Sequence, residues 1–258
     1  SLTGAPAGPA FTTAGGFVAV PAFSAPPTAP QPAIGGAQKA NINTGDTRFG
    51  GPVYRVGGSI WATDSSSIAG RSAIQWYQFD ANTFAVLRAG SISHPTLSLY
   101  FPSISANTSG DVVIGCSGSS STQPVSTYAF VGRAASATVF FSDPLLLQAG
   151  VDDYQALDGS GRNRWGDYSS VSPDPSDANR FWAIQEWVSA NDIYSTRVTC
   201  VRVCPADFDR SGTRLPADIF AFLNAYFASD PRTDFDNNNA LQPADIFAFL
   251  NNYFLGCS

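Results

Sequence analysis

Methionine is absent from this chain of 258 residues, which also holds only one histidine, His94, and one lysine, Lys39. With a net charge of -6, the chain lacks the basic face that nucleic acids and anionic membranes require. No apolar run approaches the roughly 20 residues of a membrane span. His94 has no second histidine and no nearby cysteine, which excludes the usual zinc site, and no GxSxG motif accompanies it. We expect no nucleic-acid partner, no membrane span and no catalytic set.

Cysteine is scarce as well, with four in the chain and none in a CxxC pair. Ser, Thr, Gly, Asn and Pro are abundant, as in secreted β-proteins, and this favours an extracellular or cell-surface location over a cytosolic one with buried thiols. Cys116 and Cys200 lie in expected strands, where they either pair across a sheet or stay as buried thiols. Asn107 begins an Asn-Thr-Ser sequon and is a candidate glycosylation site in that compartment. Without an initiator methionine or a signal peptide, the chain is expected to be mature or trimmed.

Residues 1–45 form an arm rich in Pro, Ala and Gly, in which the prolines exclude a helix. One stretch, GFVAVPAF at residues 16–23, is a candidate single strand, and the rest is typical of extended linkers. From residue 46 to residue 203, short strands alternate with turn residues, and no long amphipathic helix interrupts them. Successive groups of such strands predict about three antiparallel blades of a β-propeller-like domain, with a β-sandwich as the alternative.

The expected strands fall into three groups. The first holds GPVYRV, GSIWATD, SAIQWYQFD and AVLRAGSIS. The second holds YFPSISAN, GDVVIGCSG, VSTYAFVG and PLLLQAG, with the hairpin signal NTSG between its first two members. The third holds GDYSSVSPD, RFWAIQEW and STRVTCVRV.

The C-terminal part repeats itself at an offset of 27 residues: DFDRSGTRLPADIFAFLNAYF is followed by DFDNNNALQPADIFAFLNNYF. Oxygen-bearing side chains fall at positions 1, 3, 5 and 12 of each loop, the spacing with which an EF-hand loop holds Ca²⁺, and the carbonyl at position 7 adds another oxygen. Gly212 provides the bend at position 6, and Asn239 takes its place in the second loop. We therefore predict two Ca²⁺ ions, held by Asp207, Asp209, Ser211, Thr213 and Asp218 in the first loop and by Asp234, Asp236, Asn238, Ala240 and Asp245 in the second.

Each loop leads into an expected helix that begins at a proline, PADIFAFLNAYF and PADIFAFLNNYF. Apolar residues at i, i+3 and i+4 spacing predict that the two helices pack on each other. The residues are Ile219, Phe220, Phe222, Leu223, Tyr226 and Phe227, with Ile246, Phe247, Phe249, Leu250, Tyr253 and Phe254 as their counterparts. Without a cation the three carboxylates of each loop repel one another, so Ca²⁺ is expected to couple to folding.

Two features of the repeat depart from an EF-hand: Cys204-Pro205 leaves no room for a helix before the first loop, and position 12 is Asp rather than Glu. Both features resemble the dockerin family, whose fold is two loop–helix segments in tandem. RNRWGDYSSVSPDPSDANRFWAIQEW, YFPSISANTSGDVVIGCSGSS and SAIQWYQFD extend the similarity, over roughly residues 15–258, to planctomycete-type secreted propeller-like proteins that end in a dockerin. The resemblance implies a small helical, EF-hand-like dockerin module at residues 204–258.

The resemblance also implies a partner surface and a disulfide. Dockerins bind cohesin-like receptors through their helix faces and the residues just before position 12, and the matching residues are Pro216, Ala217, Leu223, Asn224, Pro243, Ala244, Leu250 and Asn251. Cys204 and Cys257 bracket the module, whose Gly-Cys end resembles a dockerin variant that terminates in this way, and a bridge between them would tie the entrance of the module to its exit. Propellers need about four to eight blades, so three blades imply either part of a larger protein or closure by assembly.

We therefore expect a secreted calcium-binding interaction protein, an extracellular structural or surface-anchored subunit. It would dock through the module onto a cohesin-like receptor or other copies of itself, in a head-to-tail polymer if the contacts do not close. The alternative is a dockerin-tethered glycoside hydrolase or carbohydrate-binding scaffold acting on polysaccharide. For these, the candidate carboxylates are Asp152, Asp153, Asp167 and Glu186. The candidate arginines are Arg162, Arg164 and Arg180, and the candidate aromatic residues, which are more often core, are Trp61, Trp76, Trp165, Trp182 and Trp187.

Overall fold

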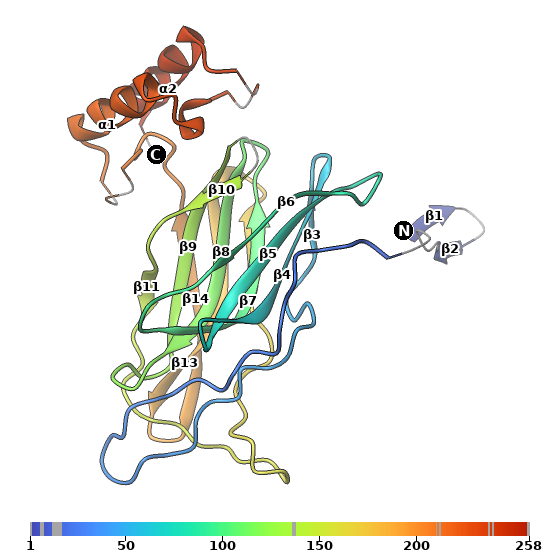
Figure 1. The fold of residues 1–258 in the computed structure, drawn as a ribbon, viewed down its shortest axis with the longest axis vertical. Coiled ribbons are helices and arrows are strands. Elements are labelled where there is room, and N and C mark those ends of the chain that lie inside the picture. The colour runs from blue at the N-terminus through green and yellow to red at the C-terminus, as the bar shows by residue number, and fades with distance from the viewer. Residues whose placement is uncertain are drawn as a thin grey trace.

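Three antiparallel sheets, each an up-and-down meander, form the body of the protein (Figure 1). The computed structural model describes residues 2–5, 8–11, 17–135, 138–209, 211, 213–236, 238 and 240–256. The first sheet has the order β3 (Tyr54–Val56), β4 (Ser59–Ile68), β5 (Arg71–Asp80), β6 (Val86–Ile92). The second has β7 (Ser98–Ala106), β8 (Asp111–Ser119), β9 (Ser126–Ala135) and β10 (Thr138–Phe141), and β11 (Leu145–Gln148) also pairs with β9. The third has β12 (Ser170–Asp174), β13 (Asp177–Ala190) and β14 (Ile193–Arg202).

The strand prediction is confirmed in all three groups, with one addition. The missed strand is β10, which pairs with β9 and completes the meander of the second sheet. Its sequence, TVFF, is short and follows β9 almost without a turn residue, so no punctuation marked it as separate.

The second sheet lies between the other two, which explains its nearly continuous run of apolar and small residues. In β8, side chains alternate between two cores. Val112 and Ile114 pack with Trp76 and other residues of the first sheet, whereas Val113 packs against Phe181 and its neighbours in the third sheet. Every residue of β8 is buried. A strand with both faces covered cannot show the apolar–polar alternation of a half-exposed strand.

A glycine permits the close contact of the second and third sheets. A Cβ on Gly115 would lie 2.4 Å from Nε2 of Gln185 and 2.9 Å from Cγ2 of Val171. Both of these side chains belong to the third sheet, so a residue larger than glycine at position 115 would push the two sheets apart.

The prediction of a mainly β protein with a small helical C-terminal part is confirmed. Across the described ranges the sheets stack face to face and close into neither a barrel nor a ring. The two helices, α1 (Pro216–Phe227) and α2 (Pro243–Leu255), lie beyond one end of the sheets with the 3₁₀ turn η1 (Pro231–Thr233) between them in sequence (Figure 1). Neither helix has the length and apolar character needed to cross a membrane.

The arm runs over the first sheet instead of forming the expected strand. Residues 17–23 contain no strand, so that expectation is wrong for these residues; residue 16 lies outside the described ranges. Backbone carbonyls of the arm accept hydrogen bonds from the first sheet outside any strand pairing: Ser67 N donates to Ser24 O at 3.1 Å, and the Gln75 side-chain amide donates to Pro21 O. Pro21 has no N–H to offer a ladder. Further out, β1 (Leu2–Ala5) and β2 (Gly8–Phe11) pair as a separate two-stranded ribbon.

Later in the arm, a compact set of contacts fixes residues 29–43 to the body. Ala29 and Ile42 form a bridge, and Ile42 also pairs with Asn163. Both apolar residues are fully buried in a third core cluster that includes Trp165. The later arm therefore belongs to the core of the β domain.

Candidate metal centres

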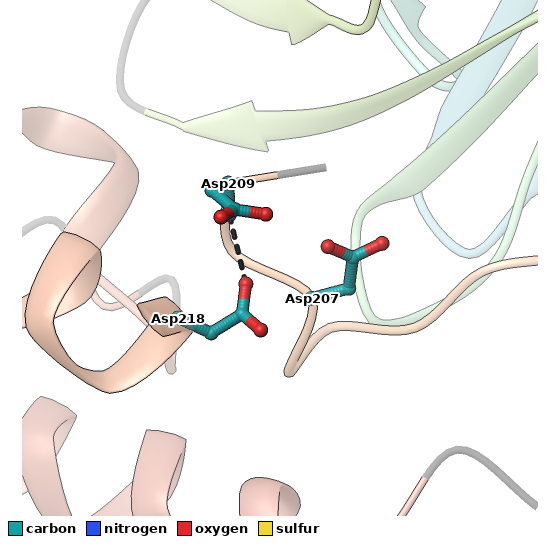
Figure 2. A group of neighbouring side chains, drawn as sticks. All are labelled: Asp207, Asp209 and Asp218. Atoms are coloured by element: carbon teal, nitrogen blue, oxygen red, sulfur yellow. Dashed lines mark hydrogen bonds between the residues drawn. The ribbon is translucent and has the colours of Figure 1, made fainter. Parts of the chain in front are cut away.

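Each repeat of the C-terminal module brings three carboxylates together. Asp207, Asp209 and Asp218 form one triad, and Asp234, Asp236 and Asp245 form the other; within each, the ligand oxygens lie within 4.8 Å of one another. Figure 2 shows the first triad: Asp218, at the start of α1, accepts a hydrogen bond from Asp209, and Asp207 lies beside them on the loop. Three negative charges at this separation repel strongly unless a cation lies among them.

The position-12 aspartates organise both loops. Asp218 is fully buried and is the third residue of α1. Its Oδ2 accepts from Leu215 N at 2.8 Å, and its Oδ1 accepts from Asp209 N at 3.1 Å. A carboxylate at this position caps the helix start and favours its dipole. One residue therefore fixes the helix start and orients the loop that carries the other ligands.

The second loop repeats this arrangement. Asp245 is fully buried, its Oδ2 accepts from Gln242 N at 2.8 Å, and its Oδ1 accepts from Phe235 N at 2.8 Å. The backbone of Asn238, at position 5, closes the loop: its N–H donates to Asp234 Oδ1 at 3.0 Å and to Asp236 Oδ1 at 3.1 Å.

In the first loop, Ser211 occupies the corresponding position. Its backbone N–H donates to Asp209 Oδ1 at 2.9 Å. This bond, followed by one from the Ser211 hydroxyl, lowers the pKa of Asp209. The Ser211 hydroxyl also lies 3.1 Å from the carbonyl oxygen of Thr213. Gly212 and Asn239, the predicted bend residues, lie outside the described ranges.

The donor set fits calcium: hard carboxylate oxygens, closely spaced and arranged on a curled loop. The predicted carbonyl ligands, Thr213 and Ala240, follow the position-5 residues along the same loops. The carboxylates at positions 1, 3 and 12 are thus brought together as the spacing predicted.

Four phenylalanines hold the two repeats together, two from each. Phe222 and Phe249 occupy equivalent positions and stack with ring centroids 4.1 Å apart and planes 4° apart. Phe208 and Phe235, each at position 2 of its loop, contact this pair edge-to-face. Phe222 and Phe249 were predicted to lie in the shared core, but Phe208 and Phe235 were not. Their recurrence at the same offset of 27 residues could have indicated them.

The helix-face prediction needs a correction. Phe220, Phe227, Phe247 and Phe254 were expected in the shared core but are 67%, 78%, 66% and 75% exposed. At 100° per residue, they fall on the sides of the helices away from Phe222 and Phe249. The expected docking residues also divide: Leu223 and Leu250 pack on the core, whereas Pro216, Ala217, Asn224, Pro243, Ala244 and Asn251 are exposed.

The module is joined to the β domain by two arginines. Arg133 of β9 donates to Phe235 O at 2.7 Å and forms an ion pair with Asp111 at 3.2 Å. Its guanidinium lies 4.5 Å from the centre of the Phe235 ring. Arg232 in turn lies over Phe140 of β10 and Phe208. The second loop is therefore fixed to the end of the middle sheet.

The cysteine predictions are resolved in part. Cys204 is disulfide-bonded; its expected partner, Cys257, lies outside the described ranges. A Cys116–Cys200 bridge is wrong, since both thiols are free. Cys116 is buried between the first and second sheets, whereas Cys200 is exposed on the third sheet opposite Trp182. The backbone of the middle sheet therefore lies between the two thiols.

Asn107, the predicted glycosylation site, is engaged in the fold. The side chain is buried, and its amide nitrogen, the atom that would carry the sugar, donates to Asp111 Oδ2 at 3.0 Å and to Ala178 O at 2.8 Å. The sequon forms the β7–β8 turn, which packs against the third sheet. In the folded protein this nitrogen therefore has two hydrogen-bond partners.

Three of the residues considered for catalysis have partners within the fold. Asp153 is fully buried and paired with Lys39 at 2.6 Å, and Asp167 is paired with Arg164. Burial, with a smaller contribution from the charge of Asp167, raises the pKa of Glu186. His94 Nδ1 accepts from the backbone N–H groups of Thr96 and Leu97, which is a turn contact.

The arginines and tryptophans do not gather into one site. Arg162 pairs with Asp158, Arg164 with Asp167, and Arg180 with Asp174 and Asp177, so three-arginine recognition of a carboxylate is not assembled. Trp61, Trp76 and Trp165 are buried in cores, as the core interpretation predicted; Trp182 is exposed and Trp187 is half-buried.

Comparison with known proteins gives no match: no family model matches the chain, and neither a curated protein nor a solved structure shows significant similarity to it.

Proposed function

We propose that this protein is a secreted calcium-binding interaction protein that docks through a dockerin-type C-terminal module. The observation that carries the proposal is the pair of carboxylate triads, which recur at equivalent positions of two repeats around one shared core. A single acidic cluster would be weak support. Two clusters with the same loop positions, each capping the following helix, favour a module built around two Ca²⁺ ions.

The partner surface is proposed to be the exposed phenylalanine pairs of the two helices. Phe220 and Phe227 on α1 correspond to Phe247 and Phe254 on α2, and all four are largely exposed. Apolar side chains repeated in this way on a small module suit an interaction surface better than isolated surface residues do. The expected partner is a cohesin-like receptor or another copy of this protein.

The β domain is proposed to be propeller-like. Three successive meanders stacked face to face match the way in which neighbouring blades pack. The outer face of the third sheet carries Trp182, Ile184 and Val198, all exposed, so a further sheet from another copy would find an apolar surface there. Head-to-tail assembly through this face and the module would make the protein an extracellular structural subunit. A three-layer β-sandwich without further sheets is the alternative.

Size-resolved light scattering with Ca²⁺ and with a chelator tests this function. We expect assemblies in Ca²⁺ that dissociate when the ion is removed, because repulsion between the carboxylates unfolds the docking surface. Calorimetric titration is expected to give two sites per chain. Asp245→Asn should remove one of them, and the exposed residue Asp143 provides the control Asp143→Asn. Monomers in both conditions, together with no calcium uptake, would overturn the proposal.

A further inference from the structure

A cavity of about 400 Å³ opens among three segments that are distant in sequence. Its walls are residues within 43–50, at and just after the end of the arm, Phe101 and Pro102 of β7, and residues within 162–168, which precede β12 in the chain. Ser65 of β4 also lines it. It belongs to the β domain, and none of the carboxylates of the calcium loops lines it. The cavity is therefore separate from the docking module.

Hydrogen bonds between the walls hold the cavity open in a fixed shape. Asn43 N donates to Asn163 O at 2.8 Å, which joins the arm to the third segment. Ser169 Oγ donates to Phe101 O at 2.8 Å. Beneath the third segment, Trp165 Nε1 donates to the buried Ser117 Oγ of β8 at 3.1 Å. A pocket whose walls are joined in this way is preformed and loses little entropy when it binds a ligand.

The β7 wall is strained. The β7–β8 register shifts between Tyr100 and Ser103, and Phe101 has φ 48°, in the left-handed region. Its ring lies against Gly45, where a Cβ would approach the ring to 2.9 Å. Bulges and left-handed non-glycine residues concentrate at binding sites, where they turn side chains out of the ladder.

The charged groups that line the cavity form ion pairs. Arg48 Nε lies 2.8 Å from Asp46 Oδ2, and Arg164 is paired with Asp167. Arg162, also in the lining, is paired with Asp158 outside it. A guanidinium has five donor N–H groups and a carboxylate about four acceptor positions, so each pair has capacity left for a ligand. The cavity thus offers both donors and acceptors with its charges largely compensated.

Aromatic rings flank these pairs. Tyr168 is 81% exposed and Phe49 is 46% exposed, and both line the cavity. Neither residue is among the candidate aromatic residues predicted from the sequence, which are all tryptophans. An exposed ring next to alternating donors and acceptors favours a ligand with an apolar face and a rim of hydroxyl groups.

We propose that this cavity binds a neutral saccharide. Each sugar hydroxyl both donates and accepts, which suits paired guanidinium and carboxylate groups, and the C–H face of a sugar ring stacks on an aromatic side chain. An anionic ligand would have to displace the carboxylates of Asp46 and Asp167 from Arg48 and Arg164. A purely apolar ligand would desolvate the ion pairs without replacing their hydrogen bonds. The inference does not depend on the calcium module, since binding here needs neither assembly nor docking.

The test is affinity electrophoresis of the full chain, in Ca²⁺, through gels that each contain one polysaccharide. Four are neutral (hydroxyethyl cellulose, xylan, galactomannan and pullulan) and one, polygalacturonate, is anionic. We expect at least one neutral polysaccharide to retard the protein. Tyr168→Ala should weaken that retardation at least tenfold, because Tyr168 is the most exposed ring of the cavity. Tyr194→Ala, which removes an exposed tyrosine elsewhere on the third sheet, should leave it unchanged.

Arg164→Ala adds a polar readout, since it should weaken binding without changing the circular dichroism of the sheets. Retardation by none of the four neutral polysaccharides would overturn the inference. So would stronger retardation by polygalacturonate than by any neutral gel, or equal losses in Tyr168→Ala and Tyr194→Ala. Failure of calcium-dependent assembly would not affect this result, so the two proposals are separable.

Discussion

Asp64 is a buried acid in the middle of β4, within a run of small polar residues. Tyr77 Oη donates to Asp64 Oδ2 at 3.3 Å. Within the described part of the chain, Oδ1 accepts no hydrogen bond. Burial raises the pKa of Asp64 to about 7, because the charged form loses its hydration without a compensating cation. The carboxyl group is therefore protonated in mildly acid solution.

We predict that stability falls as the pH rises through neutrality. The folded-state pKa of Asp64 lies above the usual value of 3.8, so its contribution is fully present below about pH 4 and is lost as the pH passes 7. Asp64→Asn should remove this decline, which we expect to be roughly 1 to 4 kcal/mol. Urea unfolding at pH 5 and pH 8 in saturating Ca²⁺ measures it, with Asp143→Asn as the control. An unchanged slope in Asp64→Asn would show that another group is responsible.

At the scale of the element, the two loop–helix repeats act as one unit because neither can bury its own phenylalanines. Phe222 and Phe249 are fully buried and cover each other across the repeat boundary. A helix of 12 or 13 residues is marginal alone in water. Each helix therefore depends on the stacked ring of the other.

From this we predict a strong contrast within one helix. Phe222→Ala should destabilise the module by about 3 to 5 kcal/mol, the range for truncating a buried aromatic residue. Phe220→Ala, two residues away and largely exposed, should cost less than about 0.5 kcal/mol. Thermal unfolding in Ca²⁺, followed by the helical circular dichroism signal, distinguishes the two. Similar losses from both changes would mean that the exposed phenylalanines also carry the fold.

At the scale of the whole molecule, the arm is integrated into the β domain by a buried ion pair. Burial favours the neutral form of Asp153, but the Lys39 ammonium and the backbone N–H of Ile34 outweigh it and lower the pKa of Asp153. Lys39 Nζ also lies 2.8 Å from Asp192. Since the arm forms one wall of the cavity, its attachment and the shape of the cavity depend on each other.

We predict that Lys39→Ala loosens the arm and destabilises the protein by about 3 kcal/mol, because it leaves a buried carboxylate without its cation. The double variant Lys39→Ala/Asp153→Asn should recover part of the loss. Limited proteolysis of the arm and urea unfolding measure the two effects. If the single and the double variant behave alike, the ion pair does not hold the arm.

Local patterns were sufficient for the strands of the three sheets except β10, for the two helices and for the spacing of the carboxylates in the two acidic loops, because alternation, proline at a helix start and acidic residues at fixed positions are properties of neighbouring residues. The repeat at an offset of 27 residues also predicted that Phe222 and Phe249 share one core, although it placed four exposed phenylalanines there as well. The nearly continuous run of apolar and small residues in β8 fits its burial on both faces, although nothing in the run says which sheets cover it.

Only the tertiary structure decided which equivalent residues meet and which remain exposed. Whether Cys116 can reach Cys200, whether the amide of Asn107 is accessible, and which phenylalanines face solvent all depend on the packing of distant segments. The cavity is formed by residues 43–50, Phe101 and residues 162–168, which no local pattern links. Its shape follows from the strained bulge of β7 and from the hydrogen bonds that join the arm to the third segment.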